Sequence, residues 1–87
     1  KENRINASQV TLYPNPSSAD FTVSLSERVK ENAKIEVVNS LGQIIYDSEI
    51  AKGNKTQTIN AANWMTGVYF VRIIGSEVHT TIKFVKQ

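Results

Sequence analysis

Apolar and polar side chains alternate along two neighbouring stretches near the end of the chain, residues 68–74 and 78–85. A period of two residues is that of a β-strand with one buried face. Three residues beginning with Gly75 separate the two stretches, so the pattern predicts antiparallel strands joined by a tight hairpin. The apolar residues predicted to face the core are Tyr69, Val71, Ile73, Val78, Ile82 and Phe84.

The first of these strands is also apolar on its second face, through Val68, Phe70 and Ile74, with Arg72 among them. Strands with two apolar faces are typical of the interior of a sheet. Residues 68–74 are therefore predicted to form a central strand, and the chain is expected to end on the strand that follows it.

Five earlier stretches also have the composition and alternation of strands. They are residues 10–13, 21–25, 33–39, 43–50 and 55–60. The first is short and stops at Pro14 and Pro16, which lack backbone donors, so it is predicted to be an edge strand. The last combines threonines with Gln57 and Ile59, and its weak apolar character predicts a second edge.

Alternate residues along these strands point to the same side, which predicts the ones that face the core. The segments between the strands have the composition of turns and loops. The inward residues are Phe21, Val23, Leu25, Ile35, Val37, Ile44, Tyr46 and Ile50. Gly42 is available for the positive φ angle that a tight reversal needs. Residues 26–32 are charged and are predicted to form a solvated loop. Residues 61–65 are predicted to be a short irregular segment that places Trp64 beneath one end of the core.

About seven short strands at regular spacing, with no amphipathic helix, predict an all-β domain. An antiparallel, immunoglobulin-like β-sandwich is the preferred fold, and a small barrel is the alternative. Residues 10–87 are assigned to this domain. Residues 1–9 are polar without a sustained period, and we expect them to link the domain to a preceding one. Because the chain starts at Lys1 rather than methionine, it is expected to be part of a longer protein.

Composition narrows the function mainly by exclusion. The 87 residues carry 10 basic and 8 acidic side chains, a formal net charge of +2, which does not indicate nucleic acid or an anionic membrane as a partner. The sequence has no apolar run of about 18 residues that would span a membrane. It also has no cysteine, so burial between sheets has to stabilise the fold without disulfides.

No set of residues predicts catalysis, a metal site or a cofactor site. His79 is the single histidine and is predicted to face solvent, whereas a metal site needs three or four convergent ligands. Asp47 and Glu49 share one face of a strand, but a catalytic carboxylate pair needs a cleft with two different environments. The sequence therefore favours a domain that is not an enzyme.

Three motifs follow one another in order. They are Tyr13-Pro14-Asn15-Pro16 before the second strand, residues 35–45 around Gly42, and residues 66–73 with Gly67 and Tyr69, followed by Lys83, Phe84, Val85 and Lys86 in the closing strand. In this order and spacing the motifs resemble the C-terminal sorting domain of the type IX (Por) secretion system of Bacteroidetes, in its type A form. The resemblance covers nearly the whole chain, from about residue 10 to residue 87. One departure is Ser18-Ala19-Asp20, where the family usually has glycine, which leaves the geometry of that turn open.

The resemblance implies a non-catalytic secretion signal at the end of a cargo protein. Such a domain would be recognised by the type IX translocon and its shuttle components, and would pass through the periplasm and the outer membrane with its cargo. A sortase-like protease would then remove it and leave the cargo at the cell surface or outside the cell. No nucleic-acid partner is expected, and an open strand edge would permit a dimer.

For recognition, the hypothesis is that residues 83–87 and the supporting strand from Gly67 form the surface that a partner captures, by strand addition or by binding a free carboxylate. The alternative for these residues is that they only close the sandwich. The competing function is an immunoglobulin-like or fibronectin-like spacer, or a carbohydrate-binding module, of an extracellular enzyme. A glycan-binding module would expose coplanar aromatic rings, and the candidates are Tyr13, Tyr46, Trp64 and Tyr69, although core positions are preferred for Tyr46 and Tyr69.

Overall fold

Seven strands make up the regular structure of the computed structural model, which describes residues 9–76 and 78–87. They are β1 (Val10–Tyr13), β2 (Asp20–Leu25), β3 (Ala33–Val38), β4 (Ile44–Ile50), β5 (Thr56–Asn60), β6 (Gly67–Ile74) and β7 (His79–Lys86). Most of the predicted linker, residues 1–8, lies outside the described residues. The division into a linker of residues 1–9 and a domain of residues 10–87 therefore stays a prediction.

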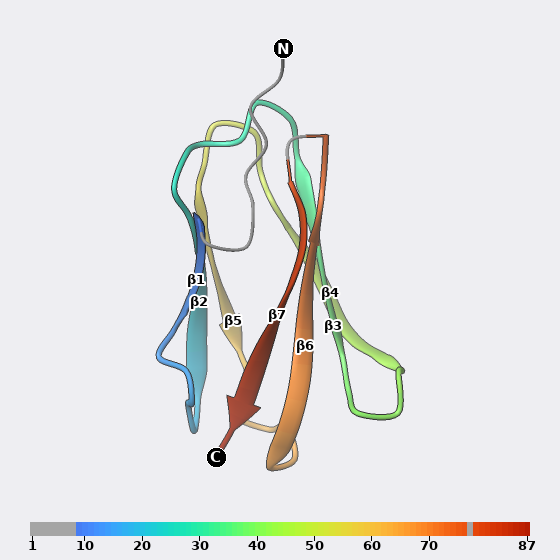
Figure 1. Cartoon of the computed structure of the whole chain (residues 1–87). Helices are drawn as coiled ribbons and strands as arrows, with labels where there is room; N and C mark the ends of the chain where they lie inside the picture. Colours follow the sequence, from blue (N-terminus) through green and yellow to red (C-terminus); the bar gives the residue numbers. More distant parts are fainter. Residues whose placement is uncertain (1–8, 77) are drawn as a thin grey trace.

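The strands form two antiparallel sheets that face each other across one core (Figure 1). One sheet has the order β1-β2-β5 and the other has the order β4-β3-β6-β7. The predicted edge strands, β1 and β5, are edges, and β6 lies between β3 and β7 as predicted for a central strand. Two separate sheets make the domain a β-sandwich rather than the small barrel.

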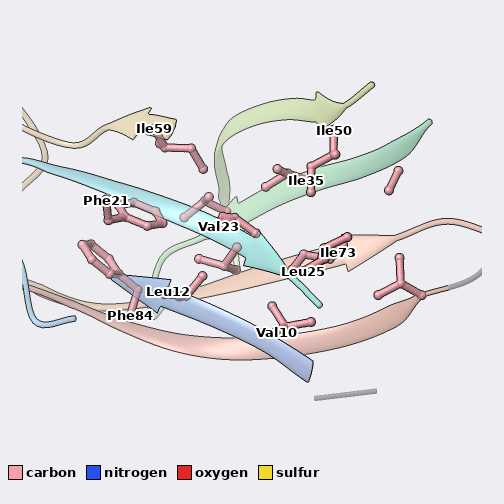
Figure 2. Close-up of a cluster of buried hydrophobic side chains, with 14 of the residues drawn as sticks. Val10, Leu12, Phe21, Val23, Leu25, Ile35, Ile50, Ile59, Ile73 and Phe84 are labelled. Atoms are coloured by element: carbon pink, nitrogen blue, oxygen red, sulfur yellow. The ribbon is translucent and has the colours of Figure 1, made fainter. Parts of the chain in front are cut away.

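Most of the core follows the predicted alternation, and Figure 2 shows the buried side chains that both sheets contribute. Val38 is an exception, because it is only 9% exposed although it follows the inward Val37 on β3. Phe21 on β2 and Phe84 on β7 come from opposite sheets and stack, with ring centroids 4.0 Å apart and planes at 22°. Both rings are at most 1% exposed. This stack joins the two layers directly through the largest side chains that are completely buried.

Trp64 extends the aromatic core toward one end, as predicted. Its ring lies 5.1 to 6.2 Å, between centroids, from those of Phe21, Tyr46, Tyr69 and Phe84. The irregular segment before β6 places it there, and a hydrogen bond of 3.0 Å from the Trp64 N–H to the Ala61 carbonyl closes the turn.

The turn between β3 and β4 has the predicted chemistry. Gly42 adopts a φ of +86°, a conformation that side chains disfavour. The Asn39 side chain completes the turn, because its Oδ1 accepts hydrogen bonds from the N–H groups of Leu41 at 2.9 Å and Gln43 at 3.0 Å.

The prediction that Ile44 faces the core is wrong, since this side chain is 53% exposed. The pairing of β3 with β4 contains a register shift, so that Val37 faces Tyr46 whereas Val38 faces Ile44. A bulge inserts one extra residue and reverses the parity beyond it. Ile44 therefore lies with Val38 on the outer face of the sheet.

Two other findings refine the pattern. The second face of β6 is apolar as noted, but Val68 is 38% and Phe70 is 37% exposed, so a central strand here does not mean burial on both sides. In the connection of residues 26–32, which is a loop as predicted, Val29 is only 2% exposed. Its backbone bonds to Asn54 and Gly53 hold this loop against the turn before β5.

Replacing Phe21 by alanine should lower the free energy of unfolding by about 3–5 kcal/mol, because the change removes the stack and leaves a cavity between the sheets. Urea denaturation followed by the fluorescence of Trp64, the single tryptophan, measures the effect. Leu41→Ala is the control, since Leu41 is 81% exposed and its loss should change stability by less than about 0.5 kcal/mol. Equal effects of the two substitutions would contradict this description of the core.

Candidate functional site at strand β7

The corner, which we define as residues 14–17, leaves β1 and runs beside the outer edge of β7, at the lower end of the sandwich in Figure 1. The peptide bonds before Pro14 and Pro16 are cis. The Asn15 side chain bonds twice to β7: its Nδ2 donates to the Lys83 carbonyl at 2.8 Å, and its Oδ1 accepts from the Val85 N–H at 3.0 Å. An amide side chain thus takes the place of a peptide group in a further strand.

The backbone of the corner continues this pairing. The Ser17 N–H donates to the Val85 carbonyl at 3.1 Å, and the Gln87 N–H donates to the Ser17 carbonyl at 2.8 Å. Ser17 and Lys86 form a parallel bridge. A segment next to the three-stranded sheet therefore closes the edge of the four-stranded sheet.

This geometry bears directly on the hypothesis of strand addition at residues 83–87. The corner already bonds the backbone groups that β7 directs away from β6 at this end of the strand. They are the carbonyls of Lys83 and Val85 and the N–H groups of Val85 and Gln87. A partner strand would have to displace the corner before it paired with this part of β7. A dimer through another strand edge stays a prediction.

The Ser17 side chain closes the turn at residues 18–20, where the sequence has no glycine. Its hydroxyl donates to the Asp20 carbonyl at 2.8 Å and accepts from the Ala19 N–H at 3.2 Å, and Ser17 is only 5% exposed. A serine side chain that bonds nearby backbone groups closes such a turn without a positive φ angle. Ser18-Ala19-Asp20 is therefore compatible with the corner.

The four motif residues at the end of β7 differ sharply in their surroundings. Lys83 is exposed, Phe84 is completely buried and Val85 is half-buried. Lys86 is buried, with 5% of the residue exposed, and its Nζ donates to the Trp64 carbonyl at 3.0 Å. Parity explains this difference, since even-numbered residues of β7 point inward. Of the two lysines, Lys83 is the one that a partner can reach.

Gly67 and Tyr69 support this end of β7 from β6. Gly67 pairs with Lys86 and Tyr69 pairs with Phe84 in the antiparallel ladder. Gly67 has a φ of +154°, which side chains rarely adopt, so glycine begins the strand. Tyr69 is buried, and its hydroxyl donates to the Met65 carbonyl.

The side chains considered for chemistry do not converge. His79, Asp47 and Glu49 are exposed on β7 and β4. In the described part of the chain, no group of three or more His, Cys, Asp and Glu side chains is placed to hold a metal ion. Residues 9–76 and 78–87 also include no helix long and apolar enough to cross a membrane.

The aromatic residues pack inward instead of forming an exposed row. Tyr46 and Trp64 are partly buried against the core, and Tyr69 is buried beside them. Tyr13 is 49% exposed but lies on β1, in the other sheet. Because a sugar platform needs several coplanar exposed rings, this packing does not favour a carbohydrate-binding module.

Comparison with solved structures shows the class of the fold. The chain is similar to the crystal structure of a DUF3244-family protein from Bacteroides vulgatus, which has an immunoglobulin-like β-sandwich fold. The TM-score is 0.75 at 21% sequence identity, and the match covers 91% of this chain and 85% of that one. At this identity the likeness establishes the fold alone, and it confirms the predicted immunoglobulin-like sandwich.

The family is shown by sequence. The model of the secretion system C-terminal sorting domain matches residues 11–87, so this chain belongs to that family of type IX sorting domains. It is also 35% identical over 72 residues to an endo-acting ulvan lyase of Formosa agariphila. The match covers 83% of this chain and 13% of the lyase, so the likeness concerns a domain and not the whole enzyme. The resemblance inferred from the motifs is confirmed, whereas the role of each motif residue stays a prediction.

Asn15→Ala should lower the free energy of unfolding by about 1–2 kcal/mol, because it removes two hydrogen bonds between the corner and β7. Asn15→Asp should also destabilise the domain, since a carboxylate would then face the Lys83 carbonyl. Urea denaturation measures both variants against Asn63→Ala, which removes an exposed asparagine outside the corner. Wild-type stability of Asn15→Ala would contradict the role of Asn15 in holding the corner against β7.

Lys86→Met should leave the free energy of unfolding within about 1 kcal/mol of wild type, because methionine keeps the packed stem and removes a buried charge. Lys86→Glu should cost more than about 3 kcal/mol, since it buries a carboxylate beside the Trp64 carbonyl. Thermal denaturation followed by circular dichroism compares the two variants. If both have the same midpoint, Lys86 is not buried as described.

Proposed function

We propose that this domain directs a preceding cargo domain across the outer membrane through the type IX secretion machinery. A sortase-like protease then removes the domain and leaves the cargo at the cell surface or outside the cell. The family match over residues 11–87 supports the export role. Protease removal and surface attachment are the further steps of the proposal, and they rest on the resemblance to the type A sorting domains.

The observation that carries the proposal is the meeting of the family motifs at one end of the sandwich. The corner bonds to β7 through Asn15, although 68 and 70 residues separate this asparagine from its partners. Gly67 pairs with Lys86, and the turn before Gly42 lines a shallow depression together with residues 65–69. Residues that are distant in sequence thus make one continuous structure, which a partner can recognise as a unit.

The same geometry supports one side of β7 as the part of the domain that a partner contacts. The inward side of β7 supplies Phe84 and Lys86 to the core, and the corner covers its edge. Its outward side, which includes Lys83, remains for contact with the export machinery. The proposed recognition surface is therefore a face of the folded domain and not an isolated peptide.

The 87-residue chain should export a reporter that carries a signal peptide, when the chain is fused behind it and expressed in a bacterium with type IX secretion. The test measures the fraction of reporter outside the cells, in that strain and in a matched strain without the outer-membrane channel. The reporter alone is the control and should remain in the periplasm. Periplasmic retention of the fusion in both strains would contradict the proposed function.

A deletion of residues 82–87 is a one-sided test. It removes Phe84 from the stack with Phe21, so loss of export would follow from unfolding as well as from lost recognition. Normal export of the deletion variant would nevertheless refute a role for β7. The urea midpoint of the deletion variant shows whether it is folded, and Lys86→Met, which keeps the packed stem of Lys86, is the folded control that should be exported like the unmodified chain.

A further inference from the structure

The outer face of the four-stranded sheet is divided into a polar end and an apolar end. In the polar end, Glu36 faces Arg72 and Asp47 across the ladders, and its carboxylate pairs with Arg72 at 3.1 Å and Lys34 at 3.3 Å. Two residues after Glu36 along β3, Val38 pairs with Ile44 on β4 and with Phe70 on β6. The face therefore changes from charged to apolar within one repeat of the strands.

Two turns enlarge the apolar end. Leu41 in the β3–β4 turn is 81% exposed, and Met65 before β6 is 82% exposed. Both residues line the shallow depression of about 270 Å³, together with Val68 and Tyr69. We define the apolar patch as the exposed side chains at this end, which are Leu41, Ile44, Met65, Val68 and Phe70.

The size of the apolar patch indicates a transient partner rather than a second copy of the chain. Its exposed surface is on the order of 500 Å², in the range of the largest patches on monomers, which are often functional. A stable dimer buries about 800 Å² on each partner, more than this patch provides. A partner that binds here and releases the domain again fits the area better.

Charge at the border of the patch indicates what that partner carries. Lys83 pairs with Phe70 across the β6–β7 ladder and is exposed. Among the described residues no carboxylate forms an ion pair with it, and Glu36 on the same face is engaged by Lys34 and Arg72. Burial of the patch would leave Lys83 next to the interface, where a carboxylate on the partner would satisfy it.

We propose that the apolar patch, bordered by Lys83, is the docking surface for a protein of the export machinery. The partner presents exposed apolar side chains with a carboxylate at their border. This proposal rests on the proposed function. The patch adjoins the structure made by the sorting motifs, since Val68 pairs with Val85 and Phe70 pairs with Lys83.

The test uses the same reporter fusion with three variants of the full chain. The first combines Leu41→Ser, Ile44→Thr and Met65→Ser, at positions that are all more than half exposed. The second is Lys83→Glu. The matched control combines Asp47→Ser, Glu49→Ser and Thr81→Ser, three exposed residues outside the patch.

The patch variant should reduce the exported fraction roughly tenfold or more, and Lys83→Glu should reduce it several-fold, at unchanged urea midpoints. The control should be exported like the unmodified chain. If the triple variant has a lower midpoint, the single variants Leu41→Ser and Met65→Ser decide, because these two side chains are about four-fifths exposed.

The outcomes separate the two proposals. If the unmodified chain fails to export the reporter, the proposed function falls and the docking surface falls with it. If the unmodified chain and the patch variants are exported equally, the docking surface is overturned and the proposed function stands. Sedimentation of the purified chain should show a monomer, and a dimer that the patch variant abolishes would reassign the patch to a second copy.

Discussion

A single asparagine side chain connects the first strand of the sandwich to the last. Asn15 follows β1, which belongs to the three-stranded sheet, and bonds to Lys83 and Val85 on the edge of the four-stranded sheet. Each such hydrogen bond contributes only about 1 kcal/mol. The geometric effect is larger, because the bonds from Asn15 and Ser17 place a second neighbour along β7. The end of the strand, from residue 83 onward, is thus held by β6 on one side and by the corner on the other.

This constraint determines what β7 can do. Its inner side chains complete the core, where Phe84 stacks on Phe21 and Lys86 reaches the Trp64 carbonyl. Its edge is bonded to the corner over residues 83–87, so this part of the edge is not an open template for another strand. Its outer side chains remain accessible, and they border the exposed apolar end of the sheet. A strand with one buried face and one accessible face fits the proposal that the signal is recognised as a folded domain.

Much of the fold was predictable because it depends on local patterns. Alternation identified all seven strands, and Pro14 and Gly42 marked an edge and a turn that the structure contains. The bulge in β3–β4 was not predictable, since nothing in the alternation around Ile44 reveals an inserted residue.

The site was predictable only in part. The motifs pointed to the corner and to β7, but the contact between them spans about 70 residues and depends on how the sheets stack. Parity alone would bury Lys86, whereas its positive charge predicts an exposed position. The bond from its Nζ to the Trp64 carbonyl makes burial possible, and that contact could not be predicted from the sequence.

Amide hydrogen exchange of the native chain directly tests the central claim that the corner closes the end of β7. The amides of Val85 and Gln87 should be protected nearly as well as those of central strand β6, whereas exchange at the rate of an unstructured peptide would contradict the closure of β7 by the corner.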